Sequence, residues 1–154
     1  MANDNQAIKL LILDDSQNNA ERMVSLLRNA GHATRAHRVT SIEDLQECLQ
    51  QNWDICLAQT ETSYMTAEDA ITLIKRQSRD IPFILLKPEI DLEMRTEALR
   101  SGMTDAVPHD ADVLLTLIVD RELANLNARR QRRIVEQTLR EAEKRCQLLL
   151  DSSV

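Results

Sequence analysis

Apolar runs of strand length alternate with longer amphipathic segments along the first 120 residues of this chain. Strands and helices that alternate in this way form βαβ units, which place successive strands in a parallel sheet. Five such pairs predict an α/β domain with a doubly wound five-stranded parallel sheet of order 2-1-3-4-5. The expected strands are residues 8–13, 33–39, 54–58, 81–86 and 105–107, and the expected helices are 16–30, 41 to at least 49, 66–77, 91–100 and from 111 onwards.

A long unbroken helix is expected at the C-terminal end. Neither Gly nor Pro occurs in residues 111–154, so a helix of about 40 residues, roughly 60 Å long, can form there. A small domain cannot cover a helix of that length. We therefore divide the chain into an N-terminal tail (1–7), a sheet domain (8–120) and an extended helix (121–154).

The extended helix carries a regularly spaced apolar seam. Its members follow one another at intervals of four and three residues: Val135, Leu139, Ala142, Cys146 and Leu149. This spacing is that of a short coiled coil, and it predicts that the chain forms a homodimer. The alternative is an amphipathic helix that folds back on its own domain.

The charge of the chain is unevenly distributed. The whole chain carries −6, and eight basic and four acidic side chains give residues 121–147 a net +4, which leaves −10 for the rest. Such an acidic body repels phosphate backbones, so nucleic-acid binding is not expected. The basic run at residues 129–133 is interpreted as a solvated helix face, with a local nucleic-acid contact as the alternative.

The remaining composition is typical of a protein of the reducing cytoplasm. Three cysteines, Cys48, Cys56 and Cys146, are widely spaced, without a CxxC pair or clustered His, so neither disulfides nor a zinc site is predicted. The N-terminus has an acid before about six apolar residues, which fits neither a signal peptide nor a membrane-spanning helix. Three histidines are expected at the surface: His32, His37 and His109.

Four segments, in order, resemble the receiver domains of bacterial response regulators. They are LLILDDSQ, WDICLAQ, IPFILLK and SGMTDAVPHD, within residues 7–120. The resemblance implies a flavodoxin-like (CheY-like) fold, in which an Asp at the end of the third strand accepts a phosphoryl group from a histidine kinase. Because the turn at Gly102 precedes the fifth strand, Lys87 and Pro88 are not the Lys-Pro pair that follows that strand in the family.

By the same resemblance, this chain keeps only part of the phosphorylation site. We name the matching positions the strand-end cluster: Asp14, Asp15, Gln59, Lys87, Ala106 and His109. The acid pair is retained, but the acceptor position holds Gln59, whose amide is a poor nucleophile and cannot form an acyl phosphate. The hydroxyl, lysine and aromatic positions hold Lys87, His109 and Ala106. We therefore expect a degenerate site with no catalysis, no bound metal and no cofactor.

One hypothesis gives Lys87 a role at the acid pair. Asp14 and Asp15 repel each other, and a Lys ammonium nearby relieves such repulsion as Mg²⁺ otherwise does. The first and fourth strands are two strand spacings apart, about 10 Å, which an extended Lys and an Asp can bridge. The alternative is that the acid pair is a relic, favourable only with the dipole of the helix that follows.

Among receivers, the chain resembles FimX-type regulators of type IV pilus twitching motility. The segments that carry this resemblance are ILDDSQNNAERMVSLLRNAG, TRAHRVTSIEDL, and RELANLNARR leading into LREAEKRCQLLLDSS. The resemblance implies that PAS, degenerate diguanylate-cyclase and degenerate phosphodiesterase domains follow this segment, the last of them binding cyclic di-GMP. Protein partners at the cell pole or in the pilus machinery are then expected, without direct cyclic di-GMP binding by this segment.

Three functions are consistent with these features. The first is a non-enzymatic pseudo-receiver that serves as an interaction and dimerisation module. The second is a true receiver that accepts phosphate elsewhere, on Glu61, Asp54 or His109. The third is a small flavodoxin-like nucleotide-binding enzyme. The lack of a Gly-rich phosphate loop stands against the third, because Gly31 and Gly102 are the only glycines.

Overall fold

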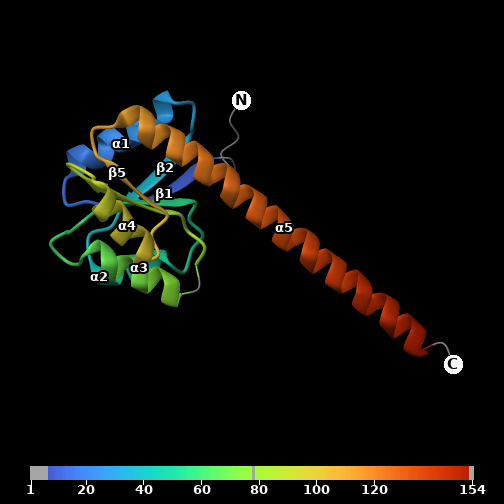
Figure 1. The fold of residues 1–154 in the computed structure, drawn as a ribbon. Coiled ribbons are helices and arrows are strands. Elements are labelled where there is room, and N and C mark those ends of the chain that lie inside the picture. Colours follow the sequence, from blue (N-terminus) through green and yellow to red (C-terminus); the bar gives the residue numbers. More distant parts are fainter. Residues whose placement is uncertain (1–6, 78, 153–154) are drawn as a thin grey trace.

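The computed structural model describes residues 7–77 and 79–152. Its five strands form one parallel sheet of order β2-β1-β3-β4-β5, which confirms the predicted topology (Figure 1). The strands are β1 (Ile8–Leu13), β2 (Thr34–Arg38), β3 (Ile55–Gln59), β4 (Phe83–Lys87) and β5 (Asp105–Pro108). The helices are α1 (Gln17–Asn29), α2 (Ile42–Cys48), α3 (Ala67–Arg76), α4 (Leu92–Arg100) and α5 (Asp112–Ser152).

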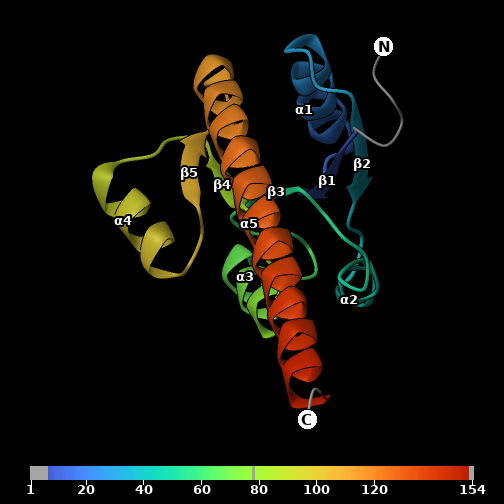
Figure 2. The same ribbon diagram turned by 90° about the vertical axis from the view of Figure 1, so that its right-hand side faces the viewer.

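The sheet separates two apolar cores. Successive side chains of a strand point to opposite faces, so Leu10 and Ile12 of β1 pack with α1 and α5, while Leu11 and Leu13 pack with α2, α3 and α4. Figure 1 shows α1 and α5 on one side of the sheet and α2 and α3 on the other, and Figure 2 shows the domain with α5 nearest to the viewer. These four residues of β1 are each at most 1% exposed. The polar strand β2 lies at one edge of the sheet, as its composition predicts.

Local signals in the sequence set the helix ends. The side chains of Ser16, Ser41 and Thr66 each accept a hydrogen bond from the backbone N–H three residues further on, which caps α1, α2 and α3. Gly31 and Gly102 have positive φ angles of 97° and 92°, a conformation that few other residues adopt, and they follow α1 and α4. These caps place each strand end, and therefore each residue of the strand-end cluster, at a fixed position.

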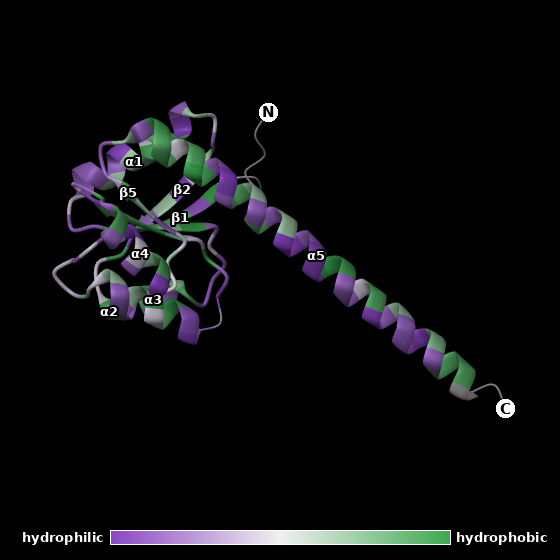
Figure 3. Ribbon diagram, viewed as in Figure 1, coloured by the Kyte–Doolittle hydropathy of each residue, from purple (hydrophilic) through white to green (hydrophobic). Residues whose placement is uncertain are grey.

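Helix α5 runs straight out of the domain. It is continuous from Asp112 to Ser152, and every residue from 131 to 150 is exposed. Its distal half carries apolar and polar residues side by side, well clear of the sheet domain (Figure 3). The extended helix is therefore confirmed, and the alternative of a helix folded back on its own domain is wrong for this distal half.

Arginines near the middle of α5 bind acids at the end of the sheet where its strands begin. Arg130 donates to the carboxylate of Asp54 at 2.6 Å and to the carbonyl of Trp53 at 3.0 Å. Arg129 donates to both carboxylate oxygens of Asp80, at 3.0 and 3.1 Å, and Arg133 also bonds to Asp80. Three arginines of this basic run are therefore paired with acids of the sheet domain while they keep contact with solvent, and α5 remains attached to the domain well beyond residue 120.

The ion pairs of Asp80 predict an acid-sensitive attachment of α5. Partial burial raises the pKa of Asp80, but the hydrogen bonds and charges of Arg129 and Arg133 together outweigh it, so the pKa lies below its usual 3.8. A carboxylate with a lowered folded-state pKa stabilises the fold above the unfolded value, and this contribution disappears as the pH falls through the folded value. We expect Asp80→Asn to be less stable than wild type at neutral pH, with the difference closing below about pH 4.

Urea unfolding of both proteins at about ten pH values between roughly 2.5 and 7 measures this difference in stability. Asp110→Asn is the matched control, because Asp110 is an exposed acid of the β5–α5 connection. A pH-independent difference between wild type and Asp80→Asn would contradict the ion-pair account.

Candidate functional site

The carboxyl ends of β1, β3, β4 and β5 bring most of the strand-end cluster to one edge of the sheet. Leu13 of β1 pairs with Ala58 of β3, so Asp14 follows directly beside the strand that ends in Gln59. Gln59 in turn pairs with Leu86 of β4, next to Lys87. The backbone N–H of His109 donates to the carbonyl of Lys87 at 2.8 Å. Parallel strands place ligand and catalytic sites at this edge.

Asp14 is a buried carboxylate with one free oxygen. The residue is 4% exposed, and its Oδ1 accepts a hydrogen bond from the backbone N–H of Ser16 at 2.8 Å. Within the described residues, no hydrogen-bond donor reaches its Oδ2. A buried oxygen without a partner is costly, so Asp14 is not a fully satisfied structural acid.

Asp15 is directed to the β3–α3 loop. Its Oδ2 accepts from the backbone N–H of Ser63 at 2.8 Å, and its Oδ1 accepts from the Ser63 hydroxyl at 3.0 Å. The two acids of the pair therefore have different environments, one buried and one exposed. Ser63 is a member of the site that sequence analysis missed, because its contact with Asp15 spans 48 residues.

Lys87 does not bridge to the acid pair. Among the ion pairs found in residues 7–77 and 79–152, none joins Lys87 to Asp14 or Asp15. Its side chain instead lines a cavity of about 560 Å³ between the end of β3, α3 and α4. That cavity has an acidic rim: Glu61, Glu68, Asp91, Glu93 and Glu97. The bridge from Lys87 to the acid pair is thus not formed among the described residues, and Lys87 contributes instead to the wall of a cavity that several carboxylates also line.

His109 is more enclosed than the sequence suggested. It is half-buried, and its ring Nδ1 is buried with no hydrogen-bond partner in the described part of the chain. Arg22 of α1 donates to the backbone carbonyl of His109 and pairs with Asp112 at 2.9 Å. His109 is therefore partly exposed, and one edge of its ring is turned away from solvent. Arg22, which fixes the β5–α5 connection, had no signal in the sequence.

The structure also places Ala106 of the strand-end cluster and the two alternative acceptors Asp54 and Glu61. Ala106 is 5% exposed and belongs to the core on the α2–α4 side, so no aromatic side chain stands at this position. Asp54, one of the alternative acceptors, precedes β3 and pairs with Arg130, so it lies at the opposite edge of the sheet. Asp54 as a phosphate acceptor of this site is therefore wrong. Glu61 is exposed in the β3–α3 loop, at the correct edge.

A receiver domain implies a Mg²⁺ ion, and the residues present fit it poorly. Mg²⁺ requires a near-octahedral set of oxygen ligands that includes carboxylates. Asp14 Oδ2 is one free carboxylate oxygen, but both oxygens of Asp15 already accept hydrogen bonds from Ser63. Gln59 stands at the acceptor position. The end of β3 therefore presents a neutral amide where the family has an Asp carboxylate.

The fold and the position of the site define a receiver domain of the response-regulator class. The chain belongs to the FleQ family, described as flagellar regulatory protein FleQ, whose profile matches residues 9–101. A curated relative is the phosphoglycerate transport system transcriptional regulatory protein PgtA of Salmonella typhimurium, 27% identical over 132 residues. The alignment covers 82% of this chain, which spans 31% of the length of PgtA.

Solved structures confirm the fold. The signal receiver domain of an HD domain-containing protein from Pseudomonas fluorescens Pf-5 is similar with a TM-score of 0.69 and 19% identity, over 86% of this chain and 98% of that one. The signal receiver domain of a signal transduction histidine kinase from Syntrophus aciditrophicus is similar with a TM-score of 0.64 and 26% identity, over 77% and 92% of the two chains. In the described residues, no helix is both long and apolar enough to cross a membrane.

Proposed function

We propose that this chain is a non-phosphorylatable pseudo-receiver that acts as a protein-interaction and dimerisation module. The observation that carries the proposal is Gln59 at the carboxyl end of β3, between Asp14 and the end of β4. A receiver needs a carboxylate nucleophile at this point, and a neutral amide cannot replace it. The module then passes information through protein contacts and through α5, not through a phosphoryl group. No enzymatic activity is assigned to it.

Binding of beryllofluoride tests the acceptor position. This anion bonds to a carboxylate oxygen and mimics an acyl phosphate, so a site with Gln59 should not take it up. We expect the ¹⁹F NMR spectrum with Mg²⁺ and beryllofluoride to contain signals of free species only, while an ordinary receiver gives signals of a bound species. A bound signal from this chain would overturn the proposal.

The distal half of α5 supports dimerisation with a second copy. Val135 and Leu139 are 65% and 57% exposed, although both are apolar. They begin the seam that continues through Ala142, Cys146 and Leu149 at coiled-coil spacing. A parallel pair of α5 helices would bury this seam and leave both sheet domains free for partners.

The wider context we propose is a FimX-type regulator of type IV pili and twitching motility that uses cyclic di-GMP. The sequence resemblance at β1–α1, at β2–α2 and along α5 supports this context. The module would then bind proteins of the cell pole or of the pilus machinery, and it would do so in the cytoplasm. Deleting this module from the full-length protein should abolish polar placement and twitching while leaving cyclic di-GMP binding intact. Loss of that binding would contradict the assignment.

A second context is favoured by the name of PgtA, a transcriptional regulatory protein, beside the match to a family described as a flagellar regulatory protein. In that case the module would be the regulatory domain of a transcription factor. The same deletion then separates the two contexts, because it would change transcript levels of target genes and leave protein placement at the pole unaffected.

A further inference from the structure

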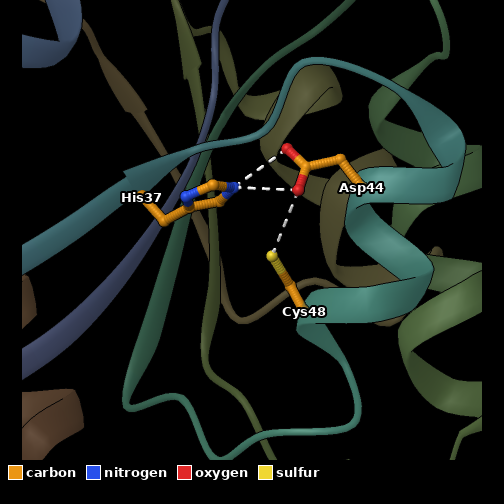
Figure 4. A group of neighbouring side chains, drawn as sticks. All are labelled: His37, Asp44 and Cys48. Atoms are coloured by element: carbon orange, nitrogen blue, oxygen red, sulfur yellow. Dashed lines mark hydrogen bonds and ion pairs between the residues drawn. The ribbon is translucent and has the colours of Figure 1, made fainter.

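Three metal-ligating side chains meet beside the edge strand β2, away from the strand-end cluster. His37 lies on β2, and Asp44 and Cys48 lie one turn apart on α2 (Figure 4). The His37 Nε2 lies 3.0 and 2.9 Å from the two Asp44 oxygens, and the Cys48 Sγ lies 3.7 Å from Asp44 Oδ1. The three ligand atoms are all within 4.8 Å of one another.

Neighbouring groups hold the three side chains in place. The backbone N–H and the hydroxyl of Thr40 both donate to Asp44 Oδ2, at 3.0 and 3.3 Å. This leaves Asp44 Oδ1 as the oxygen that faces both the imidazole and the thiol. The ring of Trp53 lies against the His37 ring at a centroid distance of 6.3 Å, and its Nε1 donates to the carbonyl of Cys48 at 2.7 Å. Such outer contacts fix ligand orientation in metal sites.

We propose that His37, Asp44 and Cys48 form a three-ligand site for a borderline divalent transition metal, of which Zn²⁺ is the representative. Imidazole nitrogen, thiolate and carboxylate are the ligand types of Zn²⁺, and three protein ligands leave a fourth position open for water or a group from a partner. The site is reachable from solvent, because the His37 side chain is 43% exposed. No zinc site was expected from the sequence, because it contains neither a CxxC pair nor clustered His. A strand residue and two helix residues one turn apart leave no such motif.

Protons balance in a simple way. In the free site, His37 Nε2 lies within hydrogen-bond distance of Asp44, and the Cys48 thiol carries its proton, because burial and the nearby Asp44 raise its pKa to about 11. Metal binding requires an Nε2 without a proton, so the imidazole proton is carried on Nδ1 in the bound state, and the thiol proton is released to solvent. The bound ion would tie α2 to β2 and therefore stabilise this edge of the sheet.

Titration of the reduced protein with Co²⁺ tests the site. A thiolate bound to Co²⁺ gives a charge-transfer band in the near ultraviolet. Added Zn²⁺ should displace the Co²⁺ ion and abolish this band. We expect one equivalent of Co²⁺ to produce this band and to quench the fluorescence of Trp53, the only Trp. His37→Gln should weaken binding by more than the roughly 10- to 100-fold that loss of an outer contact costs. Cys48→Ser should remove the band.

Cys146→Ser is the matched control, because Cys146 is exposed on α5, far from Asp44. It should keep the band at full intensity. The proposal is overturned if wild type gives no band at stoichiometric Co²⁺, or if the band survives Cys48→Ser or disappears in Cys146→Ser. Should Cys48→Ser unfold, the exposed His37→Gln variant decides the question alone, because unchanged affinity in that variant also overturns the proposal.

Discussion

Leu139→Glu is expected to convert a dimeric chain into a monomer. Leu139 is the second of the five seam residues, and a dimer would bury two copies of it. Losing two buried Leu side chains costs roughly 3–6 kcal/mol of association free energy, before the repulsion of two facing Glu is added. This corresponds to a dissociation constant raised about a hundredfold or more. Light scattering at micromolar concentration measures the mass directly.

Gln137→Glu is the matched control for this substitution. It introduces the same charge two residues away, on the opposite side of the helix from Leu139. The control should remain dimeric, and circular dichroism should show that both variants keep the sheet domain folded. A dimeric Leu139→Glu would place the interface on the sheet domain instead of α5.

Leu126→Ala is expected to lower the stability of the protein by a large amount. The side chain is 1% exposed, although it lies beyond the domain boundary that the sequence suggested. Removing a buried Leu side chain in a packed site typically costs about 2–5 kcal/mol. The free energy of unfolding from urea titration should fall by this amount, because the part of α5 that contains Leu126 belongs to the folded domain.

Leu117→Ala provides the comparison on the same helix. Leu117 is 60% exposed, so its truncation should change the free energy of unfolding by no more than about 0.5 kcal/mol. Equal effects of the two substitutions would mean that the segment around Leu126 is not packed, and that the domain ends near residue 120 after all.

Sequence analysis predicted the fold because local signals agreed with one another. Capping by Ser16 and Ser41, terminating glycines such as Gly31, and apolar runs of strand length each specify an element without reference to the rest of the chain. The parallel order then follows from the crossover rule. The positions of Asp14, Gln59 and His109 at one edge of the sheet follow from the strand ends.

Contacts between distant segments could not be predicted in the same way. Arg130 and Asp54 are 76 residues apart, and Asp15 and Ser63 are 48 apart. Nothing in the local pattern shows which arginine of the run 129–133 meets an acid. The surroundings of Lys87 could not be predicted for a related reason, because the acids that line the same cavity come from the β3–α3 loop, from α3 and from α4 with its N-cap.

Intact mass after incubation with Mg²⁺ and acetyl phosphate tests the central claim most directly. An ordinary receiver under the same conditions is the positive control. The account predicts that this chain keeps its unmodified mass, because Gln59 offers no carboxylate to the phosphoryl group. A stable adduct of one phosphoryl group would contradict it, and loss of that adduct in Glu61→Gln or His109→Gln would identify the acceptor of a true receiver.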